Sequence, residues 1–92
     1  MLKFLVHEKS DSVGVATVDM NAGENAEGLF MDSQETVQIK VLNNIPLGHK
    51  IALKDFKVSD TVIKYGHDIG EVTSDIRAGE HVHTQNLRTK RW

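Results

Sequence analysis

The chain has 92 residues, a formal net charge of −2 and no cysteine. This length allows one domain with a core too small to enclose a deep active site alone. The near-neutral charge gives no electrostatic basis for binding nucleic acid or an anionic membrane, and the lack of cysteine excludes disulfides and thiolate sites. No apolar run approaches the roughly 20 residues of a membrane span. We therefore expect a single domain, 1–92, of a cytoplasmic protein that shares any active site with another chain.

Short β-branched segments with alternating apolar residues recur along the chain, separated by clusters of Gly, Asn, Asp or Ser. This alternation predicts strands rather than long helices. The segments are FLVHE, VGVATV, TVQIKVL, HKIAL, TVIKYG and EHVHTQNL. Gly14, inside the second segment, indicates a bulge or the close approach of another part of the chain. We expect a mainly β protein with about seven short strands joined by β-turns or short helical turns.

One pattern occurs three times, at 18–24 (VDMNAGE), 54–60 (KDFKVSD) and 74–80 (SDIRAGE). Each copy contains an Asp, an apolar residue, two variable positions, a small residue and an acid. We expect the Asp to cap a turn, the apolar residue to enter the core, and Gly23 or Gly79 to adopt a positive φ. A strand follows each copy. The repeat predicts a compact, pseudo-symmetric β fold, although Asp-Gly turns are common in unrelated proteins.

The segment 43–53, NNIPLGHKIAL, combines a turn with two groups suited to anion binding. Two asparagines and Pro46 favour a turn, and Gly48 lets the backbone pass close to another group. His49, which titrates near neutrality, and Lys50, which carries a fixed charge, then enter a strand. This arrangement suits carboxylate binding. The plainer interpretation is a polar turn followed by a surface His-Lys pair.

The segment 63–72, IKYGHDIGEV, places His67 and Asp68 between two glycines, after Tyr65. A His-Asp pair can orient an imidazole, but adjacent residues rarely face each other. The glycines predict a hairpin loop of about four or five residues, with His67 and Asp68 at its tip and Asp68 bonded to its own backbone.

The segment 79–87, GEHVHTQNL, contains a second candidate site. His81 and His83 point to the same side of an extended chain, and Asn86 or Glu80 could lie nearby. Such a pair can bind a metal, but a structural zinc site needs four ligands, so the others would come from elsewhere. The alternative is an exposed edge strand with polar side chains.

The last residues, LRTKRW (87–92), are basic and end in Trp92. A terminal tryptophan beside Arg88, Lys90 and Arg91 is typical of a tail that docks on a partner surface. A disordered basic terminus is the alternative.

Several of these segments together resemble a known family. FLVHEKSDSVGVATVDMNAGE, IPLGHKIAL, VIKYGHDIGEVTSDIRAGEHVHTQNL and the ending KRW are similar to the small N-terminal domain of the altronate and galactarate dehydratases. In some bacteria this domain is a separate small subunit, of an altronate dehydratase or of a (2R)-sulfolactate sulfo-lyase. The resemblance implies an SAF-type β-clip fold, a large catalytic lyase subunit as partner, and a divalent metal, iron or a similar ion, shared with that partner.

The resemblance also implies a chemistry. Reactions of this family take a proton from the carbon next to a carboxylate of a small hydroxy acid and expel water or sulfite. A base must remove the proton while a metal or cation stabilises the developing enediolate charge. The roles we expect are catalysis for His49 and His67, substrate binding for Lys50 and Tyr65, and metal binding for His81 and His83.

Two other functions stay open on the sequence. The domain could be a non-catalytic interaction module with its histidines on the surface, or a sugar-acid-binding β-clip domain, since a fold alone does not determine function. No Walker loop, dinucleotide fingerprint or serine elbow is present, so nothing supports a free-standing enzyme. Members of the resembled family often carry another histidine between His83 and Asn86, where this chain has Thr84 and Gln85.

Overall fold

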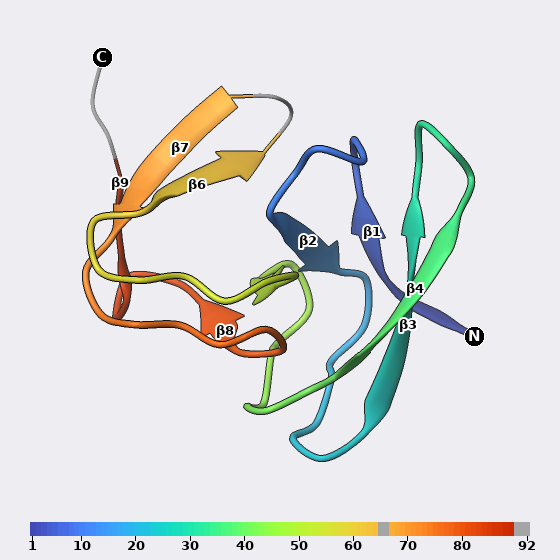
Figure 1. Cartoon of the computed structure of the whole chain (residues 1–92). Helices are drawn as coiled ribbons and strands as arrows, with labels where there is room; N and C mark the ends of the chain where they lie inside the picture. Colours follow the sequence, from blue (N-terminus) through green and yellow to red (C-terminus); the bar gives the residue numbers. More distant parts are fainter. Residues whose placement is uncertain (65–66, 90–92) are drawn as a thin grey trace.

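Nine β-strands occur in the described part of the chain, residues 1–64 and 67–89, in the computed structural model (Figure 1). They are β1 (Leu2–Val6), β2 (Val13–Ala16), β3 (Asn25–Phe30), β4 (Thr36–Lys40), β5 (Lys50–Ala52), β6 (Thr61–Lys64), β7 (His67–Val72), β8 (His81–Val82) and β9 (Leu87–Thr89). One sheet has the order β4-β3-β1-β2-β5-β8, and β6-β7-β9 form a second sheet. The prediction of a mainly β protein is confirmed. Within the same residue ranges no helix is long and apolar enough to cross a membrane.

The prediction of short helical turns is wrong for the described residues, where the connections are turns and bends. A turn that ends at the start of a strand cannot continue into the i to i−4 bonding of a helix, because the strand's backbone groups pair across the sheet. At Glu24, for example, the backbone N–H donates to the Asn21 carbonyl, and β3 begins at the next residue.

All six segments predicted from alternation contain a strand, but the strand content is larger than expected. β3 and β7 were not predicted, because NAEGLF and HDIGEV lack a clear alternation of apolar residues. The segment EHVHTQNL was predicted as one strand and instead holds β8, a turn and the start of β9. The turn begins at His83, one of the predicted metal ligands.

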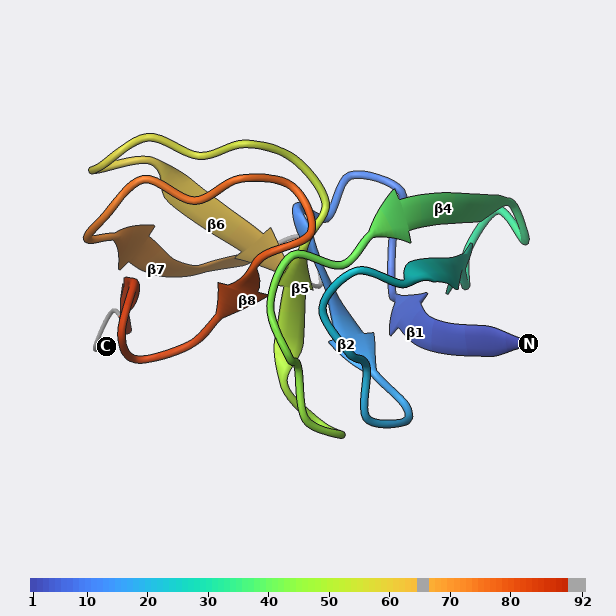
Figure 2. The same ribbon diagram turned by 90° about the horizontal axis from the view of Figure 1, so that it is seen from below.

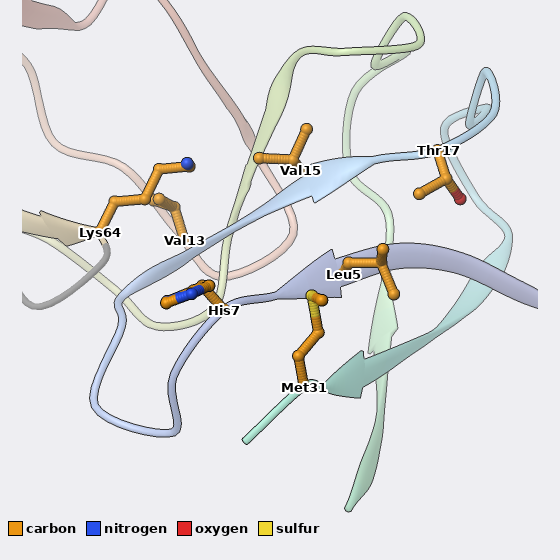
Figure 3. Close-up of a pocket in the computed structure, with 7 residues that line it drawn as sticks. All are labelled: Leu5, His7, Val13, Val15, Thr17, Met31 and Lys64. Atoms are coloured by element: carbon orange, nitrogen blue, oxygen red, sulfur yellow. The ribbon is translucent and has the colours of Figure 1, made fainter. Parts of the chain in front are cut away.

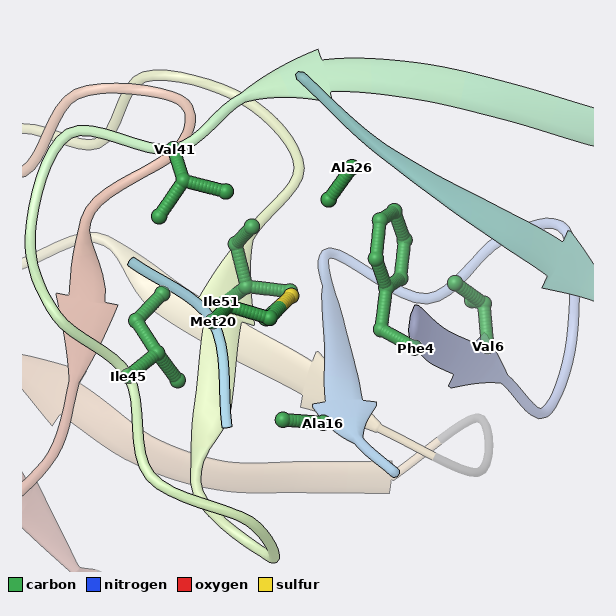
Figure 4. Packing of buried hydrophobic residues seen from close by; sticks show 8 residues of the cluster. All are labelled: Phe4, Val6, Ala16, Met20, Ala26, Val41, Ile45 and Ile51. Atoms are coloured by element: carbon green, nitrogen blue, oxygen red, sulfur yellow. The ribbon is translucent and has the colours of Figure 1, made fainter. Parts of the chain in front are cut away.

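The core consists of two clusters that meet at the paired strands β2 and β5. Ile51 and Ala52 are neighbours in β5 and enter different clusters, because neighbouring residues of a strand point to opposite faces. Figure 2 shows β6 and β7 on one side of β2 and β5, and β1 and β4 on the other. The first cluster, drawn in Figure 4, contains Phe4, Val6, Ala16, Met20, Ala26, Val41, Ile45 and Ile51. The second contains Val13, Ala52, Phe56, Val62, Val72, Ile76, Val82 and Leu87.

Gly14 and Gly28 make room for the Phe4 ring in the first cluster. A Cβ on Gly14 would lie 2.8 Å from Phe4 Cδ2, and one on Gly28 would lie 2.0 Å from Phe4 Cε2. The close approach predicted at Gly14 is therefore confirmed. Gly28 is the reason why β3 carries no apolar side chain at its centre.

The turn predicted in three copies occurs in a fourth place, 44–49, where Asn44 stands for the Asp and His49 for the acid. The apolar second position of every copy is buried, and the copies associate in two pairs through the isolated bridges Met20 to Ile45 and Phe56 to Ile76. The fifth position has a positive φ in all four copies, at Gly23, Gly48, Ser59 and Gly79. Each pair of copies belongs to one of the two core clusters, so the chain has a pseudo-symmetric arrangement.

The Asp or Asn that begins each turn caps the partner turn rather than its own. Asp19 Oδ1 accepts the Leu47 N–H at 2.8 Å, and Asn44 Oδ1 accepts the Ala22 N–H at 2.9 Å. The second pair repeats the exchange: Asp55 Oδ1 accepts from Ala78 at 2.8 Å and Asp75 Oδ1 accepts from Val58 at 3.0 Å. The capping role predicted for the Asp is thus confirmed, with the recipient in the partner turn.

Replacing Asp75 tests this exchange. We expect Asp75→Ala to lower the free energy of unfolding by about 1 kcal/mol, because the Val58 N–H loses its acceptor. Asp75→Asn serves as the matched control, since Asn44 performs the same role in the other pair. Urea denaturation followed by circular dichroism measures both. Equal losses in the two variants would contradict the capping role of the side-chain oxygen.

Candidate metal centre

Three histidines come together where β5 pairs with β8. His49 directly precedes β5, His81 is the first residue of β8, and His83 directly follows β8. The strands are antiparallel, with Lys50 opposite Val82. Val82 is buried, and the residues before and after it project to the other face. The rings of His81 and His83 stack at a centroid distance of 5.4 Å and an interplanar angle of 8°, as expected for side chains on the same side.

Each of the three imidazole rings lies close to the other two. His49 Nδ1 is 2.8 Å from His81 Nε2, and the ring centroids of this pair are 5.0 Å apart. The His49 and His83 rings stack with centroids 4.4 Å apart. One ligand nitrogen from each of the three residues can be chosen so that all lie within 4.8 Å of one another. All three side chains are half-buried, so the cluster faces solvent on one side.

The surroundings of His81 favour its neutral form. Burial lowers the pKa of the His81 imidazole below its ordinary value. The nearby His49 and His83, and then Lys50, lower this pKa further, because each disfavours another positive charge. A neutral imidazole is the form that binds a metal ion. The lowered pKa of His81 thus favours the form of this imidazole that ligation needs.

Amide side chains hold the backbone of this cluster. Asn43 Oδ1 accepts the His81 N–H at 2.9 Å, and Gln85 Nε2 lies 3.3 Å from His81 Nδ1. Asn86 bonds to the backbone of both His81 and His83. Of these three residues only Asn86 was expected near the pair. Asn43 could have been found only from the β5–β8 pairing, because it lies far from His81 in the sequence.

His49 is available for this site because its turn has lost a cap. In the other three copies the acid at the sixth position accepts the N–H of the third residue: Glu24 from Asn21, Asp60 from Lys57 and Glu80 from Arg77. The fourth copy has Pro46 at the third position, and proline has no N–H to donate. A carboxylate at position 49 would therefore have no structural role there. The histidine that replaces it points to His81 instead.

Other residues predicted for the site lie in different places. Lys50 is the half-buried first residue of β5, beside the cluster. His67 begins β7, opposite Lys64 in the three-stranded sheet, and is not part of the cluster. Asp68 accepts the Gly70 N–H as predicted, but both residues lie in the strand rather than at the hairpin tip. Tyr65 lies outside the described residues.

The predicted docking tail begins inside the fold. Leu87 is buried in the second core cluster, and 87–89 form β9, which pairs with β7. The Arg88 side chain forms an ion pair with Glu71 at 2.5 Å. Residues 90–92, including Trp92, lie outside the described residues. The first half of the segment is thus a strand.

A hollow of about 210 Å³ lies against β1 and β2 (Figure 3). Its lining is mostly apolar and includes none of the three clustered histidines. The lining residues are Leu5, His7, Val13, Val15, Thr17, Met31 and Lys64. The three-histidine cluster therefore lies outside this hollow, at an open surface.

A small β domain that presents three imidazoles on one open surface has the donor set of a metal centre that another chain can complete. The sequence model of the altronate/galactarate dehydratase SAF domain matches residues 2–90, and the chain belongs to this family.

Two kinds of relatives carry this domain. The chain is 48% identical over 92 residues to the (2R)-sulfolactate sulfo-lyase subunit alpha of Chromohalobacter salexigens, covering 99% of this chain and 98% of that one. The subunit alpha of Paracoccus pantotrophus is 59% identical over 49 residues, 53% of this chain and 73% of that one. The altronate dehydratase of Bacillus subtilis is 38% identical over 89 residues, 97% of this chain but 17% of the enzyme. The same domain thus occurs as a separate subunit and within a longer chain.

Restoring the missing cap in the turn 44–49 should have opposite effects on the stability of the chain and on its metal binding. We expect Pro46→Arg with His49→Glu, which copies Arg77 and Glu80, to raise the free energy of unfolding by about 1 kcal/mol through the regained hydrogen bond. The same variant should bind divalent metal more weakly, because one imidazole is gone. Urea denaturation and metal titration measure the two effects. His49→Glu alone is the control, and an equal stability gain in that variant would contradict the role assigned to Pro46.

The lowered pKa of His81 predicts a pH dependence for the metal-free chain. The unfolded histidine titrates near 6.5, so below about that pH the unfolded chain binds a proton that the folded chain does not. The contribution of His81 to the stability is present in full above about pH 6.5, and it is lost as the pH falls from there through the pKa of the folded state. Carboxylates such as Glu24, whose pKa the Lys3 hydrogen bond lowers, act only at lower pH.

Thermal unfolding in the presence of a chelator, between about pH 7.5 and pH 5.5, measures this loss. His81→Gln cannot titrate and should give a flatter profile over the same range. A wild-type profile as flat as that of the variant would contradict the pKa assigned to His81.

Proposed function

We propose that this chain is the small subunit of a two-component lyase, of the sulfolactate sulfo-lyase or altronate dehydratase type, which acts on a small hydroxy acid. The observation that carries the proposal is the cluster of His49, His81 and His83 in a chain that matches a named lyase subunit over almost its full length. Residues 1–92 would form one SAF-type β-clip domain, and the lack of cysteine fits a reducing cytoplasm as its location.

The donor set fits a divalent metal ion, and iron is the ion we propose. Imidazole nitrogens suit iron, zinc, copper and nickel, and catalytic sites commonly use three protein ligands and leave an open position. Nitrogens bound to one such ion lie roughly 3 Å apart, a spacing that His49 and His81 already have. His49, predicted as catalytic, is therefore proposed as the third ligand beside His81 and His83.

The large subunit would supply the other half of the site. The cluster is open to solvent on one side, and the hollow beside β1 and β2 does not enclose it. In the Bacillus subtilis altronate dehydratase the equivalent domain is 17% of the chain, which leaves a large remainder to act as the partner does here. We infer that the large subunit covers the open side and contributes the base.

Within this shared site the small subunit binds and orients. A metal ion, when bound, supplies positive charge for the enediolate that forms next to the substrate carboxylate. Lys50 stands at the start of β5 with a fixed charge and would hold an anionic end of the substrate, a carboxylate or a sulfonate. Burial, His49 and His83 lower the pKa of His81, and the charge of Lys50 adds to this effect. The catalytic role of His67 and the substrate role of Tyr65 stay predictions.

Mixing this chain with its candidate large subunit and Fe²⁺ tests the proposal. Sulfolactate and altronate are assayed in parallel: release of sulfite would identify a sulfo-lyase, and formation of a keto sugar acid a dehydratase. We expect His83→Ala to lower turnover by more than the roughly 10- to 100-fold typical of a lost outer-shell partner. Size-exclusion chromatography must show that the complex still forms.

His7→Ala is the matched control, because His7 lies on β1's side of the molecule and is not part of the cluster. A normal complex that acts on neither substrate would favour the non-catalytic interaction module. Binding of a hexonate by this chain alone would favour the sugar-acid-binding domain.

A further inference from the structure

A reciprocal four-residue turn recurs in the described part of the chain. The residue that ends the turn donates its N–H to the carbonyl three residues earlier, and its side chain accepts the N–H of that same earlier residue. The pairs are Glu8–Asp11, Asn21–Glu24, Lys57–Asp60, Arg77–Glu80 and His83–Asn86. Four of these five caps are carboxylates. Only the turn that begins at His83 uses an amide.

The amide does something that a carboxylate cannot do. Asn86 Oδ1 accepts the His83 N–H at 3.0 Å, which is the capping bond common to the five turns. Asn86 Nδ2 also donates to the His81 carbonyl at 2.7 Å. A carboxylate in this position would have no hydrogen to donate at neutral pH. One side chain thus connects the two residues whose rings stack.

This connection fixes the backbone from which both rings project. The His81 N–H is held by Asn43, its carbonyl by Asn86, and the His83 N–H by the other end of the same amide. Val82, between them, is fully buried. With these groups fixed, the relative direction of the two rings depends on little more than their own side-chain torsions.

We propose that Asn86 is a positioning residue that presets His81 and His83 for a metal ion. The inference rests on the metal role proposed above. Pre-organised ligands bind more tightly because less freedom is lost on binding, and removal of such a supporting group typically costs about 10- to 100-fold in metal affinity. Asn86 does not itself touch the metal or the substrate in this assignment.

The test compares Asn86→Ser with Asp60→Ser in the full chain. Serine is a competent turn cap, but its short side chain cannot also reach the His81 carbonyl. Asp60 caps the equivalent turn on Lys57 and is not part of the histidine cluster, so its variant reports the cost of the cap alone. Co²⁺ is titrated into each protein, and its absorption gives the dissociation constant. We expect a rise of about 10-fold or more for Asn86→Ser and none for Asp60→Ser.

A metal-free measurement separates this inference from the proposed function. Nuclear Overhauser contacts between the His81 and His83 rings should be present in the wild type and in Asp60→Ser and be lost in Asn86→Ser. Ring contacts or a Co²⁺ affinity that survive unchanged in Asn86→Ser would overturn the inference. If the wild type itself does not bind Co²⁺, the metal role fails, and the ring contacts alone decide whether Asn86 positions the histidines.

Discussion

The exchange of caps between paired turns is the constraint on which the rest of the structure depends. A side-chain oxygen in one turn accepts an N–H from its partner, and the reverse bond closes the pair, as between Asp19 and Leu47 and between Asn44 and Ala22. The apolar residue next to each cap is thereby held in the core. Because each bond joins segments distant in sequence, the strands that follow the turns start from fixed positions, including the two strands that carry the histidines.

The histidine cluster arises from one departure from this repeat. A turn that kept an acid at its sixth position would use that acid on its own backbone, as Glu80 does. Because Pro46 has no N–H at the third position, the sixth residue, His49, does not cap its own turn and can face another segment. The acids at the sixth position of the other three turns are used in hydrogen bonds to their own turns. This explains why the turn that contributes a histidine to the cluster is the one without a side-chain cap on its third residue.

Much of this arrangement could be predicted from the sequence, and the remainder depends on pairing that no local pattern reveals. The alternation of apolar residues predicted the strands that contain β-branched residues, and the spacing from Asp to the acid predicted three turns. The fourth turn was missed because Asn44 and His49 replace the two most diagnostic residues. Its His49 meets His81 only because β5 pairs with β8, 32 residues along the chain. The turn after β8 could have been predicted from the sequence, because Asn86 follows His83 at the same interval as Asp60 follows Lys57.

The location of the cluster between the two core halves has a mechanical consequence. His49 ends a turn of the first pair, whereas His81 follows a turn of the second, so the strands β5 and β8 form a seam between them. An ion held by both would join segments 32 residues apart in the sequence and stabilise the folded state that binds it. A subunit with an ion bound would then resist local opening and proteolysis along this seam more than a subunit without one.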